Sequence, residues 1–89
     1  MSRTYKEAQE LVYYMNQTIE KMGGFIIGWH HSSEGTGVTV GVRNDESYSE
    51  IVEIMEKLQE MYGGEIQYCE YWECEGFISH SQAILEVDA

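Results

Sequence analysis

The stretch "MGGFIIGWHHSSEGTGVTVGV", residues 22–42, contains the change of periodicity that decides the fold. Before it, apolar residues recur every three or four positions, which is typical of one face of a helix. Within it, apolar residues alternate with polar residues or glycine, which is typical of a half-buried strand. The Gly23-Gly24 pair marks the boundary, because glycine readily adopts the left-handed conformation that ends a helix.

The same stretch contains one hairpin. A two-residue turn at Glu34-Gly35 pairs Trp29 with Val40 and predicts two strands with one apolar face. The residues expected on that buried face are Phe25, Ile27, Trp29, Val38, Val40 and Val42. The residues expected on the other face are Gly28, His30, Ser32, Thr39 and Gly41.

The second half of the chain repeats this organisation at an offset of about 40 residues, because Gly63-Gly64 follows a second helical stripe. A turn at Glu75-Gly76 again separates two alternating runs. Its buried face is expected to hold Ile66, Tyr68, Trp72, Cys74, Phe77, Ala83, Leu85 and Val87. The helical stripes are expected to be Tyr5, Ala8, Val12, Met15, Ile19 and Met22 in the first half, and Tyr48, Ile51, Met55, Leu58 and Tyr62 in the second.

The predicted fold class is therefore α+β, with two αββ units in the order αββαββ. Alternation and turn positions favour a four-stranded antiparallel sheet with both helices on one face. The 89 residues suffice for a single domain, residues 1–89, with an internal pseudo-repeat of residues 4–43 and 45–88.

The charge is concentrated in the second half of the chain. Residues 45–89 hold twelve of the sixteen acidic residues and only one base, Lys57, so they account for the whole net charge of −11. A field of this sign repels nucleic acid and anionic membranes and attracts basic protein surfaces. The alternative is that the acidity serves solubility alone.

Most of these carboxylates are expected on the outer face of the second helix and on the second hairpin, with an exposed tyrosine among them. We predict that this surface binds a partner through Glu46, Glu50, Glu53, Glu56, Glu60, Glu65, Glu73, Glu75 and Tyr71. Glu86 extends the same field.

The two cysteines do not form a joint site. Cys69 and Cys74 lie five residues apart on one strand, so they face opposite sides about 16 Å apart, too far for a disulfide or a shared metal. Neither a metal nor any other cofactor is expected. An alternative zinc set combines Cys69, His80 and His30, if the two hairpins lie side by side.

An enzyme is not predicted. His30 and His31 are neighbours on a strand and point to opposite faces, and no Ser-His-Asp or Cys-His order indicates a nucleophile. No apolar run reaches membrane-spanning length and no leader-like segment opens the chain, so we expect a cytoplasmic protein with reduced thiols.

The first functional hypothesis is a non-enzymatic, acidic protein-binding inhibitor. It belongs to the kind that phages and mobile elements use, such as anti-CRISPR, anti-restriction or DNA-mimic proteins, and it occupies a basic nucleic-acid-binding surface of a host protein. It binds no nucleic acid directly. The second hypothesis is a small regulatory or ligand-binding domain that forms a homodimer through its second sheet face.

Overall fold

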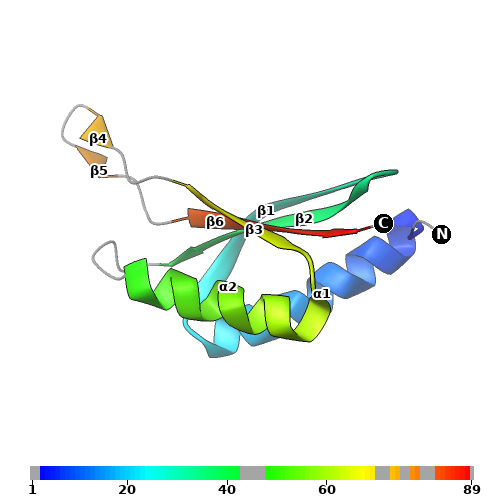
Figure 1. Ribbon diagram of the computed structural model, residues 1–89, viewed down its shortest axis with the longest axis horizontal. Helices are drawn as coiled ribbons and strands as arrows, with labels where there is room; N and C mark the ends of the chain where they lie inside the picture. The colour runs from blue at the N-terminus through cyan, green and yellow to red at the C-terminus, as the bar shows by residue number, and fades with distance from the viewer. Residues whose placement is uncertain (1–2, 43–47, 70–72, 75–76, 79–81, 89) are drawn as a thin grey trace.

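The computed structural model in Figure 1 describes residues 3–42, 48–69, 73–74, 77–78 and 82–88. Two α-helices and a four-stranded antiparallel sheet confirm the α+β class. The helices are α1 (Tyr5–Lys21) and α2 (Tyr48–Tyr62). The strands are β1 (Gly24–Ser32), β2 (Gly35–Val42), β3 (Glu65–Cys69), β4 (Glu73–Cys74), β5 (Phe77–Ile78) and β6 (Gln82–Asp88).

A capping box begins α1. The backbone N–H of Thr4 donates to Glu7 Oε1 over 3.1 Å, and the backbone N–H of Glu7 donates to Thr4 Oγ1 over 3.2 Å. Both donors belong to the first turn of the helix, where no intrahelical partner exists. At the other end Gly23 adopts a φ of 89°, which lets the chain leave the helix and enter β1 directly.

The main sheet has the strand order β1-β2-β6-β3, and all its neighbours are antiparallel. The second strand of each hairpin therefore lies at the centre, and β1 and β3 form the edges. A separate two-stranded sheet of β4 and β5 projects beyond the main sheet at one end (Figure 1).

The register of the first hairpin differs from the predicted one. Ser32 pairs with Gly35, so the turn is at Ser33-Glu34, and Trp29 pairs with Val38 rather than with Val40. A β-bulge between Ile26 and Gly28 then shifts the register once more. The prediction that Phe25 and Ile27 lie on the buried face was wrong. Because of the bulge, Ile26 is the residue that lies opposite the buried Val40.

The second hairpin keeps the register that a two-residue turn at Glu75-Gly76 predicts. Cys74 pairs with Phe77 in the small sheet, and Glu65 pairs with Glu86 in the main sheet. One register therefore runs through both pieces of the hairpin. The turn residues themselves, and Trp72 of the predicted buried face, lie outside the described residues.

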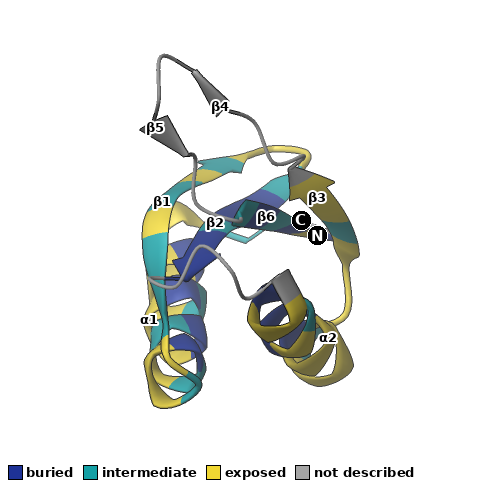
Figure 2. Cartoon of the chain, turned by 90° about the vertical axis from the view of Figure 1, so that its left-hand side faces the viewer, coloured by how far each residue is buried: buried dark blue, intermediate teal, exposed yellow. Residues whose placement is uncertain are grey.

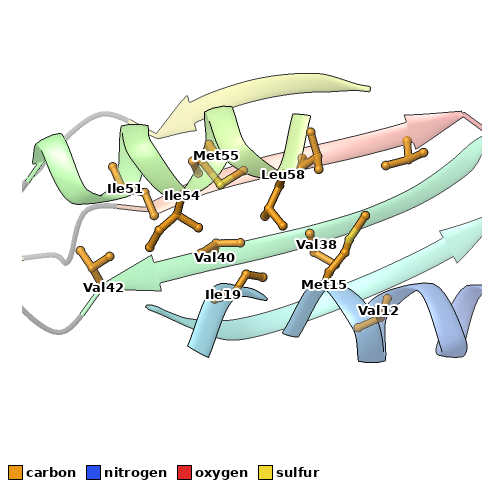
Figure 3. Packing of buried hydrophobic residues seen from close by; sticks show 13 residues of the cluster. Val12, Met15, Ile19, Val38, Val40, Val42, Ile51, Ile54, Met55 and Leu58 are labelled. Atoms are coloured by element: carbon orange, nitrogen blue, oxygen red, sulfur yellow. The ribbon is translucent and has the colours of Figure 1, made fainter. Parts of the chain in front are cut away.

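The core lies between the sheet and the two helices, which Figure 2 shows on the same side of the sheet. Figure 3 shows how side chains of both helices meet β2. The buried cluster consists of Val12, Met15 and Ile19 of α1, Ile51, Ile54, Met55 and Leu58 of α2, Val38, Val40 and Val42 of β2, and Ala83, Leu85 and Val87 of β6. Tyr5 is an exception to the predicted stripe, because it is 62% exposed and packs its ring against Trp29 at a centroid distance of 5.6 Å.

Candidate protein-binding surface

The outer face of α2 presents four exposed glutamates to solvent: Glu50, Glu53, Glu56 and Glu60. They point outward because the four core residues of α2 fix the opposite side of the helix against the sheet. Three pairs of these glutamates are three or four residues apart, where like charges repel by a few tenths of a kcal/mol. Lys57 is the only base in the helix sequence.

The charge at the carboxyl end of α2 has the unfavourable sign for the helix dipole. Its last turn contains no basic residue but includes the carboxylate of Glu60. The carbonyl groups at this end carry partial negative charge and favour a cation instead. Glu50, in the first turn, suits the helix dipole, but Glu60 and the repulsion between neighbouring glutamates act against the helix that carries them.

Glu65 lies on a different surface, the sheet face away from the helices, because its neighbour Ile66 packs against the core. It is exposed at the start of β3, and only Gly63 and Gly64 separate it from the end of α2. The side chain of Gln59 donates to the carbonyl oxygen of Gly64 over 3.1 Å. Glu65 pairs directly with Glu86 of β6, which is also exposed. Like charges directly opposite in a ladder destabilise the sheet.

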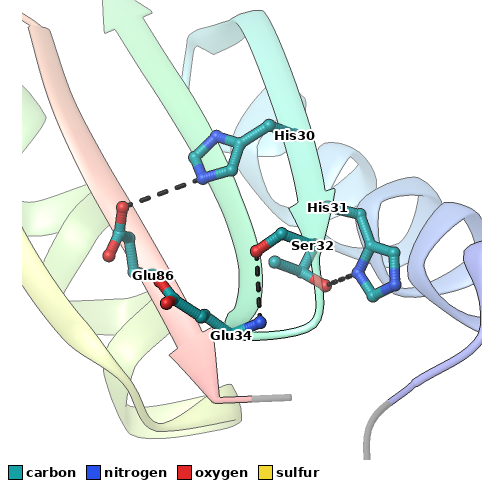
Figure 4. A network of polar contacts seen from close by, with 6 residues as sticks. His30, His31, Ser32, Glu34 and Glu86 are labelled. Atoms are coloured by element: carbon teal, nitrogen blue, oxygen red, sulfur yellow. Dashed lines mark hydrogen bonds and ion pairs between the residues drawn. The ribbon is translucent and has the colours of Figure 1, made fainter.

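His30 is the basic neighbour of these carboxylates. Its Nε2 lies 3.8 Å from Glu86 Oε1, and its imidazole covers Gly37, where any side chain would collide with the ring (Figure 4). His31 lies on the opposite side of β1 and its Nδ1 is joined to Thr36 Oγ1 by a hydrogen bond of 2.9 Å. The two histidines therefore do not share a site.

A shallow hollow of about 180 Å³ lies at the tip of the first hairpin. Its lining is mostly polar and includes three carboxylates and one imidazole. The lining residues are His30, Ser32, Glu34, Gly35, Thr36, Glu65, Glu86 and Val87. Among the residues that the structure describes, no group of three His, Cys, Asp or Glu side chains is arranged to hold a metal ion.

The structure describes six of the nine predicted site residues. Glu50, Glu53, Glu56, Glu60 and Glu65 are exposed along α2 and the start of β3. Glu73 lies in β4, whereas Glu46, Tyr71 and Glu75 lie outside the described residues. The alternative zinc set of Cys69, His80 and His30 is not tested, because His80 also lies outside them.

The sequence pattern did not indicate the apolar side chains on the sheet face that the helices do not cover, where Ile27 is exposed and Phe25 is half-buried. Phe25 and Ile27 were expected in the core, but they lie on this face and cover Gly41. One signal was available, because a glycine inside a strand, here Gly28, often accompanies a bulge.

Comparison of the chain with protein-family models, with curated proteins and with solved structures finds no match. Neither of the helices in the described part of the chain is both long and apolar enough to cross a membrane.

Proposed function

We propose that this protein is a non-enzymatic, acidic protein-binding inhibitor that occupies a basic, nucleic-acid-binding surface of another protein. The observation that carries the proposal is the exposed row of Glu50, Glu53, Glu56 and Glu60 on α2. Glu50 suits the first turn of the helix, but the rest of the row weakens α2 through like-charge repulsion and through Glu60 at the negative helix end. A basic partner offsets that repulsion.

The chemistry of the partner follows from this row. A groove that binds nucleic acid presents lysine and arginine side chains to a line of phosphates. A row of carboxylates on a rigid helix offers such a groove a second line of negative charges, so the two ligands compete. Proteins of this kind are found among phage and mobile-element inhibitors, including anti-CRISPR, anti-restriction and DNA-mimic proteins, and we propose the same cytoplasmic role here.

A second candidate function is a regulatory or ligand-binding domain that dimerises through the sheet face away from the helices. Ile27 favours it, because this apolar side chain is 47% exposed on that face. The two candidates differ in their dependence on salt. An acidic inhibitor loses its partner as salt shortens the screening length to about 3 Å at 1 M, whereas an apolar dimer does not.

The test uses two matched charge reversals. Glu50→Lys/Glu60→Lys alters the acidic face of α2, and Glu10→Lys/Glu20→Lys alters the positions 40 residues earlier on α1 by the same charge. Each immobilised protein is used to capture proteins from a bacterial lysate at low salt. The captured proteins are then eluted with duplex DNA and, separately, with high salt.

We expect the wild type and the α1 variant to capture the same basic proteins, which duplex DNA and high salt both release. The α2 variant should capture at least tenfold less of them. Equal capture by both variants, or capture that duplex DNA leaves intact, would show that the acidic face is not the binding surface.

A further inference from the structure

The sheet face away from the helices has a neutral, partly apolar end. Residues on this face alternate with the core residues of the same strands, so they project away from the helices. Residues paired side by side across neighbouring strands form rows on this face. The first row contains Phe25, Gly41 and Gln82, and the next contains Gly28, Thr39, Ile84 and Gln67. Neither set includes a charged residue.

The bulge in β1 gives this end its apolar surface. It adds Ile27 to the face beside Phe25, and Gly41 beneath them leaves room for both side chains. A Cβ built on Gly41 would lie 2.9 Å from Ile27 Cδ1 and 3.2 Å from Phe25 Cζ, so the two side chains lie close to the backbone of the sheet. Ile84 is partly exposed on the same face.

The next row on the same face is charged. Along it His30, Gly37, Glu86 and Glu65 are paired across all four strands. Both glutamates are exposed. The face therefore changes from apolar to acidic within the length of one strand.

We propose that this face is the anchoring site for the basic partner, with an apolar side chain of the partner against Phe25, Ile27 and Ile84 and a neighbouring lysine or arginine on Glu86 and Glu65. The inference rests on the proposed function, because it assumes a basic protein partner. It adds that the partner is recognised by an apolar side chain next to a cation, and not by charge alone. An apolar centre beside a charged rim is the arrangement from which interfaces gain most of their affinity.

A second copy of the chain fits this face less well. Each copy carries a net charge of −11 and would bring the same pair of glutamates to the interface. Like charges across an interface oppose association, whereas a cationic segment complements them. The charge of the face therefore selects a basic partner over self-association.

The test uses two synthetic peptides of equal charge and the full-length protein labelled with ¹⁵N. In one peptide a leucine stands between lysines, and in the other a serine replaces that leucine. Titrations followed by NMR give the affinity of each peptide and the amides that it shifts. The variant Ile27→Ser removes an exposed apolar side chain from the proposed site, and Tyr13→Ser removes a still more exposed side chain from α1 as the control.

We expect the leucine peptide to bind about tenfold more tightly than the serine peptide and to shift the amides of Ile27, Gly28 and Ile84. Ile27→Ser should abolish this preference, and Tyr13→Ser should leave it unchanged. Ile84→Ser provides a second variant if a thermal melt shows that Ile27→Ser is not folded.

Two results would overturn the inference alone. One is equal affinity for both peptides with shifts confined to α2, which would leave the proposed function intact. The other is a concentration-dependent dimer in sedimentation that Ile27→Ser dissociates, which would identify a second copy as the occupant. If neither peptide binds at low salt, the inference and the proposed function both fail.

Discussion

The two helices bury similar side chains but differ in how their charges suit the fold. α1 buries Ala8, Val12, Met15 and Ile19, and α2 buries Ile51, Ile54, Met55 and Leu58. α1 begins with a capping box and has Lys21 in its last turn, where a cation is favourable. α2 has no basic residue in its last turn and carries four exposed glutamates.

The fold does not require the difference in charge between the outer faces of the two helices. Both helices contribute to one core, so packing alone does not explain why their outer faces differ in charge. Glu7 and Lys21 suit the two ends of α1, whereas Glu60 and the repulsion between neighbouring glutamates act against α2. The outer face of α2 is therefore the place to look for a role other than folding.

The largest effect should be the same in both helices. Met15→Ala in α1 and Leu58→Ala in α2 each remove a fully buried side chain from the common core, so each should lower the free energy of unfolding by about 2–5 kcal/mol. Urea denaturation measures both. If one helix tolerated its substitution within about 1 kcal/mol, it would not be an equal part of the core, and the comparison would break down.

The next effect concerns the end of α1. Thr4→Ala removes the hydroxyl that accepts the N–H of Glu7, and we expect a loss of about 1 kcal/mol in the free energy of unfolding. Thr4→Ser keeps a hydroxyl at this position and should retain most of the stability. Equal losses in the two variants would point to the methyl group of Thr4 rather than to capping.

A smaller effect of opposite sign is expected at the end of α2. Glu60→Lys removes repulsion from Glu56 but adds repulsion from Lys57, so its net effect comes from placing a cation at the negative end of the helix and should be a stabilisation of about 0.3–1 kcal/mol. Glu20→Lys in α1 should gain less, because Glu20 accepts a hydrogen bond of 3.1 Å from the side chain of Asn16. Thermal unfolding at low salt compares the two, and a larger gain in α1 would contradict the contrast between the helices.

The smallest effect is the pH dependence of the capping box. The backbone N–H of Thr4 donates to the Glu7 carboxylate and, with a lesser contribution from the Thr4 side chain, lowers the pKa of Glu7 below its ordinary value. A carboxyl whose pKa is lower in the folded state stabilises the protein above the unfolded pKa of about 4.3. That stabilisation is lost as the pH falls through the lowered pKa.

Glu7→Gln makes this prediction measurable. The variant should unfold at a lower temperature than the wild type at pH 7, and the gap should close at a pH below the lowered pKa of Glu7. An NMR titration of the Glu7 carboxyl gives the pKa directly. A gap that persists unchanged in acid would mean that the charge of Glu7 has no part in the capping box.

The two hairpins show how far the sequence predicts this fold. In the second hairpin the pairs of both pieces keep the register that the turn position predicts, even though Ala83, Ile84 and Leu85 are all apolar. In the first hairpin Phe25, Ile26 and Ile27 are all apolar, so alternation cannot indicate which of them bulges. The bulge is settled by packing, because only Ile26 of the three packs against the core.

The candidate binding surface can likewise be predicted only in part from the sequence. The exposure of the α2 glutamates follows from the helical stripe, since residues between core positions must face solvent. The apolar end of the sheet face follows from no local pattern. It depends on the bulge in β1 and on Gly41 in β2, and these two strands meet only in the folded protein.

The bulge has a further consequence, which concerns aggregation. β1 is a nine-residue edge strand, and a long regular edge offers a template on which strands of other molecules can assemble into fibrils. An extra residue at Ile27 interrupts the even spacing of amide and carbonyl groups along that edge, so an incoming strand cannot pair with its whole length. The opposite edge, β3, is only five residues long and begins with a glutamate, so it too is a poor template.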